Sequence, residues 1–130
     1  MKTNLQKLIG TVVLGLALVS TSLPAWAGLV IQPEVYVQVG FASGSTVAAR
    51  YSTDSKQYIG CKLSNNGTFV MCLATDKTGK SAVCTSTDPR FATVIKALTD
   101  FSYINFESAQ GTGSCLELNV VNESYLISND

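Results

Sequence analysis

Histidine is absent from this chain of 130 residues. That absence excludes the Ser-His-Asp and Cys-His arrangements of nucleophilic catalysis, and it excludes imidazole as a metal ligand. We therefore expect a protein that is not an enzyme and that uses no cofactor and no metal. If any catalysis remains, its chemistry is that of carboxylates.

Charge is scarce as well. Charged residues make up 14% of the chain, with nine basic and nine acidic side chains. A near-neutral chain lacks the basic footprint of a nucleic-acid-binding protein. It also lacks the polybasic segment that would hold a protein on anionic lipid. These two partner classes are therefore excluded, and the low charge favours a compact domain over disorder.

An apolar run at the N-terminus, Leu8–Val19, is too short to span a bilayer. Lys2 and Lys7 precede it, and the small-residue pattern Ala25-Trp26-Ala27 follows it. This order of basic start, apolar run and small residues is that of a secretory signal peptide. We expect residues 1–27 to be removed by cleavage after Ala27, leaving a secreted or periplasmic product without stable membrane insertion.

The remaining residues, 28–130, are enough for one domain and too few for two. All four cysteines lie in this part of the chain: Cys61, Cys72, Cys84 and Cys115. An even number of cysteines in a small exported domain predicts two disulfides, which leave no thiolate nucleophile. A four-thiolate zinc site usually contains Cys-x2-Cys pairs, and no two cysteines here are that close.

Alternation of apolar and polar residues predicts a strand in most segments of the domain. The expected strands are Glu34–Phe41, Thr46–Ser52, Gln57–Leu63, Thr68–Ala74, Ser81–Thr85, Ser102–Glu107, Cys115–Val121 and Ser124–Ile127, with a turn at Ala42–Ser45. Because Thr68–Ala74 is apolar on both faces, we expect it in the middle of a sheet that is covered above and below. In the strand from Cys115, we expect Leu116, Leu118 and Val120 to face inward.

One segment has helical rather than strand periodicity. Asp88-Pro89 is a helix start, since aspartate caps the first turn and proline tolerates its first position. Phe91, Val94, Ile95 and Leu98 then fall on one face of a helix that ends near Asp100. The sequence therefore predicts an α+β fold: a mainly antiparallel sheet, as a sandwich or partly open barrel, with one helix near Asp88–Asp100 and two disulfides.

The hairpin Tyr58–Cys72 bears on the disulfide pairing. If Asn66-Gly67 is a two-residue loop, Cys61 lies directly opposite Cys72, within disulfide reach. If Lys77-Thr78-Gly79 is the next loop, Cys72 also lies opposite Cys84. Two connectivities therefore remain open: 61–72 with 84–115, or 72–84 with 61–115. We prefer the first, because the Asn-Gly turn fixes its register more firmly.

Two carboxylates are the minimum that a hydrolase without histidine needs, as in glycosidases. Glu107 and Glu117 flank one predicted hairpin and can face each other across it. They lie on its polar side, where carboxylates are ordinarily solvated. A small carboxylate-dependent hydrolase is therefore an alternative rather than the first hypothesis.

Tyrosines among small polar residues are typical of surfaces that bind by shape and adaptable hydrogen bonds. Tyr36 and Tyr103 fall on the expected solvent side of their strands. The loop Ser52–Ser55, with Asp54, and the glycine-rich loop Ala109–Gly113, with Gly111 and Gly113, are candidate contact loops. We expect these five residues to contact a partner, which would be a protein or another cell-surface component.

Three patches carry a resemblance: Ala49–Ser55, Tyr58–Cys61 and Ser102–Phe106. In these patches the chain resembles small exported bacterial proteins with four cysteines. The resemblance implies bacterial export, and it implies no particular reaction.

The leading functional hypothesis is a secreted or periplasmic, disulfide-stabilised binding module without enzymatic activity. An inhibitor of a foreign secreted enzyme, such as a lysozyme or protease, is its most concrete form, because a rigid loop or edge suits that task. The alternatives are a self-assembling cell-surface structural protein, built through exposed strand edges, and the small hydrolase.

Overall fold

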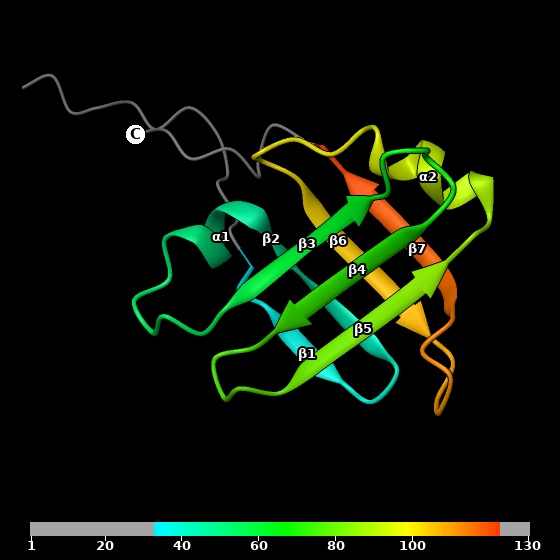
Figure 1. Ribbon diagram of the computed structural model, residues 1–130. Coiled ribbons are helices and arrows are strands. Elements are labelled where there is room, and N and C mark those ends of the chain that lie inside the picture. The colour runs from blue at the N-terminus through cyan, green and yellow to red at the C-terminus, as the bar shows by residue number, and fades with distance from the viewer. Residues whose placement is uncertain (1–32, 123–130) are drawn as a thin grey trace, which may run out of the picture.

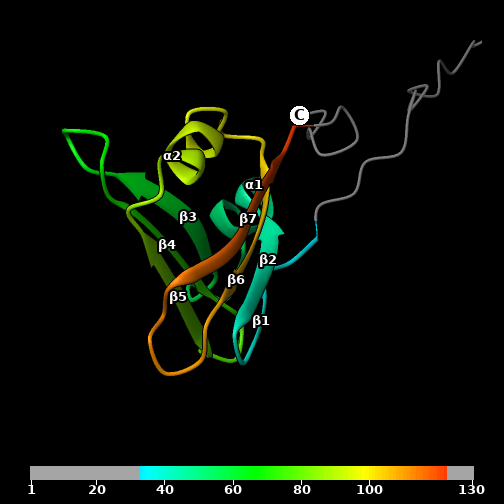
Figure 2. The same ribbon diagram turned by 90° about the vertical axis from the view of Figure 1, so that its right-hand side faces the viewer.

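Two antiparallel β-sheets pack face to face with their strands crossing, as Figures 1 and 2 show. This computed structural model describes residues 33–122. The elements are β1 (Tyr36–Gln38), β2 (Phe41–Ser45), α1 (Thr46–Arg50), β3 (Tyr58–Leu63), β4 (Val70–Thr75), β5 (Ser81–Ser86), α2 (Pro89–Ile95), β6 (Tyr103–Ser108) and β7 (Cys115–Val121). One sheet has the order β1-β2-β6-β7 and the other the order β3-β4-β5. The predicted α+β class and the mainly antiparallel sheets are confirmed, as an open sandwich rather than a closed barrel.

The predicted signal peptide, residues 1–27, and the predicted last strand, Ser124–Ile127, lie outside the described residues.

The core lies between the two sheets, where every second side chain of each strand points inward. Ile104, Phe106 and Leu118 face it from the four-stranded sheet, and Val70, Cys72, Ala74 and Cys84 from the three-stranded sheet. Both helices lie at one end of the sandwich (Figure 2). There α2 adds Ala92 and Ile95 to the core.

The predicted strand Glu34–Phe41 is wrong in its extent. The chain turns back at Val39 and Gly40, so that Gln38 pairs with Phe41. Gly40 has a φ of 76°, a conformation open to glycine at little cost.

The predicted turn at Ala42–Ser45 is wrong too, because these residues are the buried part of β2. Gly44 explains why small residues serve here: a Cβ on Gly44 would lie 2.9 Å from Val35 Cα. The close approach of two backbones, and not a turn, is the reason for this run of small residues.

The predicted strand Thr46–Ser52 is also wrong. Its first five residues form α1, a helix that the sequence did not predict. Ser45 caps this helix, because its hydroxyl accepts a hydrogen bond from the Ala48 amide at 3.3 Å. Ala48, Ala49 and Arg50 are good helix formers. The β-branched residues Thr46 and Val47 suggested a strand, but the cap and the alanines decide the local structure.

The helix α2 begins where the sequence predicts and ends earlier. Asp88 Oδ1 accepts from the Arg90 amide at 2.9 Å, and Pro89 occupies the first turn. The regular helix ends at Ile95, and tighter turns continue to Leu98, whose amide donates to Ile95 O at 3.0 Å. These turns replace the last part of the predicted helix.

The predicted disulfide pairing is confirmed: Cys61 bonds to Cys72, and Cys84 bonds to Cys115. Cys61 and Cys72 are direct cross-strand partners with Cα atoms 4.0 Å apart. The hairpin loop between them is wider than the expected two residues, because the strands end at Leu63 and Val70. The register is nevertheless the predicted one.

A β-bulge in β7 overturns the prediction that Leu116 faces inward. Glu107 pairs with Glu117, but Ser108 pairs with Cys115, so that Leu116 is an extra residue without a partner. Leu116 is 64% exposed, while Leu118 is buried as predicted. The bulge also moves Cys115 from the outward to the inward side of its strand, which allows it to reach Cys84 in the other sheet.

Candidate interaction surface

The outer face of the three-stranded sheet is apolar and exposed. In β4 the side chains of Val70, Cys72 and Ala74 point into the core, and those of Met71 and Leu73 point away from it. We call this surface the outer sheet face. It consists of Tyr58, Gly60 and Lys62 of β3, Phe69 directly before β4, Met71 and Leu73 of β4, and Val83 of β5. The prediction that β4 is covered on both faces is therefore wrong.

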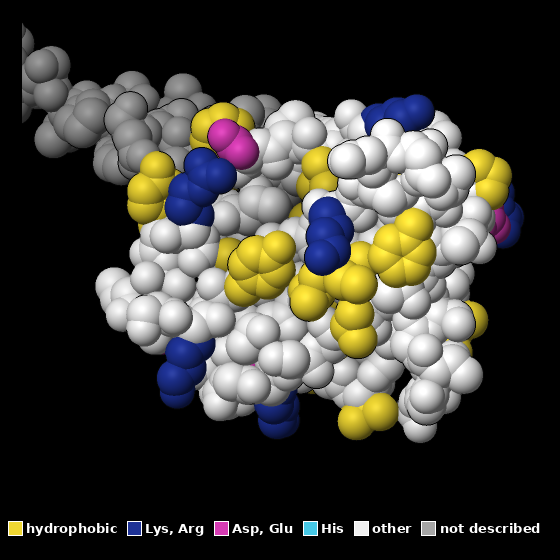
Figure 3. Space-filling view, viewed as in Figure 1, with side chains coloured by type: hydrophobic (Ala, Val, Ile, Leu, Met, Phe, Trp, Pro, Cys, Tyr) yellow, Lys and Arg dark blue, Asp and Glu magenta, His cyan; other side chains and the backbone are white. Residues whose placement is uncertain are grey.

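Apolar side chains gather on this face around one basic side chain, as Figure 3 shows. Lys62 lies opposite Met71, and Gly60 lies opposite Leu73. Among the face residues named above, Lys62 carries the only charge. Tyr58 is 52% exposed and Val83 42% exposed, so that the apolar surface is open to contact.

Glycine at position 60 shapes this face. A Cβ on Gly60 would lie 3.0 Å from the hydroxyl oxygen of Tyr58 and 3.4 Å from its Cζ. The Tyr58 ring therefore leans over the glycine. A side chain at position 60 would push this ring away, and the glycine keeps the middle of the face flat.

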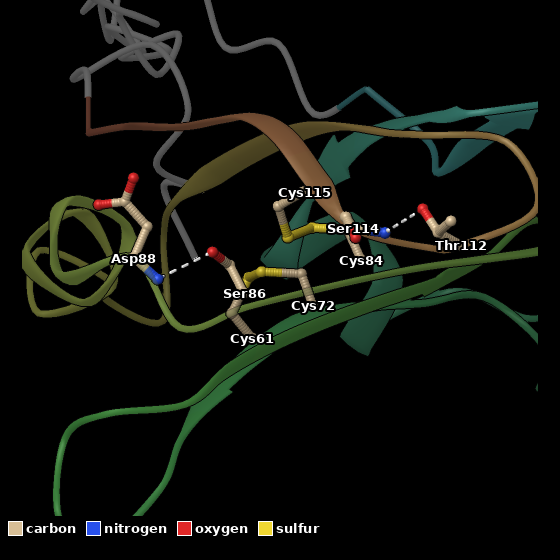
Figure 4. Close-up of a disulfide and its surroundings, with 8 residues drawn as sticks. All are labelled: Cys61, Cys72, Cys84, Ser86, Asp88, Thr112, Ser114 and Cys115. Carbon is tan, nitrogen blue, oxygen red and sulfur yellow. Dashed lines mark hydrogen bonds between the residues drawn. A yellow bond between two sulfur atoms is a disulfide. The ribbon is translucent and has the colours of Figure 1, made fainter.

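The two disulfides hold the sheet from behind this face. They lie next to each other between the sheets (Figure 4). Cys72 is the cross-strand partner of both Cys61 and Cys84, so that the cysteines form a row across β3, β4 and β5 that Cys115 extends to β7. The outer sheet face is therefore covalently braced in two directions.

A shallow depression of about 670 Å³ adjoins the face at Val83. Its other walls are the turn with Val39 and the loop with Gly111 and Gly113. Both glycines have positive φ angles, of 84° and 68°. The Gly113 carbonyl accepts from the Thr85 amide at 2.8 Å, which fixes this loop against β5. Two of the predicted contact residues thus lie beside the outer sheet face.

The other three predicted contact residues lie elsewhere. Tyr36 and Tyr103 are on the outward side of the four-stranded sheet, in different rows, where Tyr36 is exposed and Tyr103 half-buried. Asp54 lies in the loop before β3, and its carboxylate accepts from the amides of Lys56 and Gln57 at 2.8 and 2.9 Å. The structure does not bring these three together, and their contact role stays a prediction.

Glu107 and Glu117 are direct cross-strand partners, as the sequence allows. Both are exposed on the outward side of the four-stranded sheet. Glu117 accepts a hydrogen bond from the side-chain amide of Asn119, which also donates to Asn105 Oδ1 at 3.0 Å. The pair lies on an open sheet surface, and its role in hydrolysis stays a prediction.

Three aspartates have a lowered pKa, and each of them forms hydrogen bonds in a local turn or at a helix end. The Thr78 hydroxyl, 2.7 Å away, and two backbone amides hold the pKa of Asp76 below its usual value. The side-chain amide of Gln57 lowers the pKa of Asp54 in the same way. The side chain of Arg90 lowers the pKa of Asp88. In each case the hydrogen bonds that favour the ionised carboxylate also fix a turn or the start of α2.

Sequence reasoning missed the outer sheet face because it assigned β4 to a fully covered position. A signal for it was present in β3. Tyr58, Gly60 and Lys62 alternate with Ile59 and Cys61 in the pattern of a strand with one buried side. Since β3 and β4 are neighbours in one sheet, an exposed face on β3 continues onto β4.

Fold and surface together define a small disulfide-linked β-sandwich with one exposed apolar sheet face. Within residues 33–122, no helix has the length and apolar character needed to cross a membrane. Comparisons with protein-family models, curated proteins and solved structures found no match to this chain.

Proposed function

We propose that this protein is an exported, non-enzymatic binding module that contacts a partner protein through the outer sheet face. The observation that carries the proposal is the contiguous apolar surface formed by Tyr58, Met71, Leu73 and Val83. Exposed apolar patches of this kind mark interaction sites on proteins that are otherwise well solvated.

The size of the face indicates how much of the surroundings a partner must also contact. Three strands of six residues cover about 300 Å² at the usual strand spacing and rise. A stable interface needs about 800 Å² on each partner. The depression beside Val83, with Gly111 and Gly113, supplies additional contact area at the edge of the face.

Charge defines the partner further. Lys62 stands among apolar side chains on this face, and no carboxylate accompanies it there. A complementary partner surface is apolar and carries a carboxylate that faces the ammonium group of Lys62. Such a charge pair contributes mainly to specificity and to the rate of association.

Inhibition of a foreign secreted enzyme is the most concrete form of this function. A binding surface that is rigid before contact loses little conformational entropy on binding. The two disulfides behind the face provide that rigidity. Reduction of these two disulfides should therefore weaken binding as well as lower stability.

The test is to measure the activity of secreted lysozymes, and of the main protease classes, with increasing amounts of the oxidised, exported protein. Where inhibition is found, Lys62→Glu should weaken it at least about tenfold, the effect of losing a contact of about 1.4 kcal/mol. Lys96→Glu, the same change at the residue that follows α2, is the matched control and should leave inhibition unaltered. Equal inhibition by both variants would exclude the outer sheet face, and no inhibition in the whole panel would exclude the inhibitor function.

A second candidate function, self-assembly at a cell surface, is favoured by the position of β3 at an edge of its sheet. An unpaired strand edge can accept a strand of a second copy. Sedimentation of the oxidised protein over a wide concentration range distinguishes the two functions. A strict monomer at high concentration argues against assembly and leaves the binding module standing.

A further inference from the structure

The edge of β5 that lies away from β4 carries unpaired backbone groups at Ser81 and Val83. The Asp76 amide donates to Lys80 O at 2.9 Å, which makes these two residues a hydrogen-bonded pair at the start of the ladder between β4 and β5. By alternation, Ala82 bonds to β4, while the N–H and C=O groups of Ser81 and Val83 point away from it. Within residues 33–122, no backbone group pairs with these outward groups.

This edge is open at its start and closed at its end. Ser81 is exposed, and Val83 is 42% exposed. The next residue with the same orientation, Thr85, is already paired, because its amide donates to Gly113 O at 2.8 Å. Natural proteins usually protect a free edge with charge, proline or a bulge. The strand Ser81–Ser86 contains no charge and no proline, and its pairing with β4 is regular.

The depression beside Val83 runs along the open part of this edge. Residues 81–83 form one side of it, and the turn with Val39 and the loop of residues 108–113 form the others. In Figures 1 and 2 the loop between β6 and β7 lies beside β5. An extended chain takes about 160 Å³ per residue, from the usual rise, strand spacing and sheet spacing. The depression, at about 670 Å³, therefore has room for about four residues of one strand.

The depression is uncharged. None of its lining residues, all of which belong to the described part of the chain, is acidic or basic. Val39, which is 79% exposed, and Val83 supply apolar surface, and Ser108 and Thr112 supply hydroxyl groups. A charged side chain would lose hydration here without gaining a partner of opposite charge. The lining therefore favours an uncharged ligand.

We propose that the depression beside Val83 binds an extended, uncharged segment of a partner protein as a short strand next to β5. The backbone of this segment bonds to the outward N–H and C=O groups of Ser81 and Val83, as in other complexes in which a peptide adds a strand to a sheet. Its side chains point alternately into the depression and outward beside Val83. The site goes beyond the proposed function, because it needs no contact with Lys62 and can fail or stand without the outer sheet face.

A second copy of the chain fits this edge less well than a separate segment. In a two-fold antiparallel pair of β5 strands centred on Ala82, Gly79 of one copy would lie opposite Thr85 of the other. Gly113 already occupies that position. A centre nearer the start of β5 would leave fewer strand residues to pair. A single extended segment avoids this conflict, because it can end before it reaches Thr85.

Titration with blocked peptides, followed by the amide NMR signals of the oxidised exported protein, tests the proposal. The probes have about six residues, slightly more than the depression holds, and alternate threonine with valine, isoleucine or tyrosine. The amide signals of Ser81 and Val83 should shift in a saturable way, with a dissociation constant of about 1 mM or lower. The amide of Ala82, which bonds to β4, should shift less.

Two N-methylated versions of each binding peptide are the matched pair of probes. In one version the odd-numbered amides are methylated, and in the other the even-numbered amides. Since only every second residue of an added strand bonds to β5, one version should lose at least about tenfold in affinity and the other should retain it. This measurement uses the unaltered protein, so that it does not depend on the folding of any variant.

A substitution on the protein side gives an independent measurement. Val83→Pro removes an outward donor and no bond to β4, which is the position in which an edge strand tolerates proline. It should weaken peptide binding at least about tenfold. Val83→Thr keeps the amide and the branched shape, and it is the matched control that should bind normally.

Three results would overturn the proposal. The first is that no peptide shifts the amides of Ser81 and Val83, and the second is that both N-methylated versions bind equally. The third is a shift of these amides with protein concentration alone, because a second copy would then occupy the edge. Peptides that shift the amides of Lys62 and Met71 instead would overturn this site and support the outer sheet face.

Discussion

Removal of the disulfide between Cys84 and Cys115 should destabilise this domain more than removal of the one between Cys61 and Cys72. The first closes a loop of 31 residues and the second a loop of 11. Loop-closure entropy in the unfolded chain gives about 3.7 kcal/mol for the longer loop and about 2.8 kcal/mol for the shorter one. The expected difference is therefore about 0.9 kcal/mol in the free energy of unfolding.

The two bonds are well matched in other respects. Each joins one fully buried cysteine, Cys84 or Cys72, to one half-buried cysteine, Cys115 or Cys61. Replacement of each pair by alanine therefore removes similar buried volume, and the cavity cost is similar. The disulfide between Cys84 and Cys115 also links the two sheets, which adds to the difference in the same direction.

Urea unfolding followed by far-UV circular dichroism measures this. Tyrosine fluorescence is a second probe, because the single tryptophan of the chain is Trp26, in the predicted signal peptide. For slopes of about 1–3 kcal/mol per molar urea, the two double variants should differ by about 0.3–0.9 M in midpoint. Equal midpoints, or a lower midpoint for Cys61→Ala with Cys72→Ala, would refute the reasoning from loop length.

Three further predictions concern single side chains. Gly44→Ala should cost about 1–3 kcal/mol, because the new Cβ meets the Val35 backbone; an unchanged melting temperature would contradict that contact. Asp88→Ala should cost about 1 kcal/mol through loss of the α2 cap, and Asp88→Asn should cost less; equal costs would show that the cap contributes nothing. The bond from Thr78 lowers the pKa of Asp76 below 3.8, so that its stabilisation is full above that pH and is lost as the pH falls through the folded value. The stability gap between Asp76→Asn and the parent should therefore close in acid, and a gap that stays constant down to pH 2 would be inconsistent with this role.

Much of the three-stranded sheet could be predicted from the sequence, because local turn chemistry determines it. Gly79, with a φ of 90°, closes the loop between β4 and β5 where a three-residue turn needs a left-handed residue. With both turns placed, counting along the strands puts Cys72 opposite both Cys61 and Cys84. The firmer Asn-Gly turn favoured the pairing of Cys61 with Cys72, and the structure confirms that preference.

The segment Ala42–Ser52 could not be predicted, because its residues meet partners that are distant in sequence. Position 44 requires a glycine because the Val35 backbone lies against it. The Thr46 amide donates a hydrogen bond to Ser102 O at 3.0 Å. Local propensity indicated a turn and then a strand. The packing of β2 between β1 and β6, with Ser45 as a cap, produced a strand and then a helix.

The candidate site was predicted only in part. The glycine loop beside the outer sheet face was identified, but the face itself was taken for a covered surface, since FVMCLA is apolar at every position. Composition does not distinguish a strand that is buried on both sides from one whose second side is exposed and apolar. That distinction depends on what packs above the sheet, and both helices lie at the end of the sandwich instead.

The sequence by itself determined the features that depend on neighbours along the chain: the strand pairing of β3, β4 and β5, and the cap of α2. For the cysteines it left two pairings open, and the structure decided between them. The tertiary structure decided the features that depend on contacts between distant segments. The bulge at Leu116 is the clearest of them, because period-two alternation would direct Cys115 outward. Only the approach of the two sheets shows why one extra residue is inserted there and which apolar side chains remain exposed.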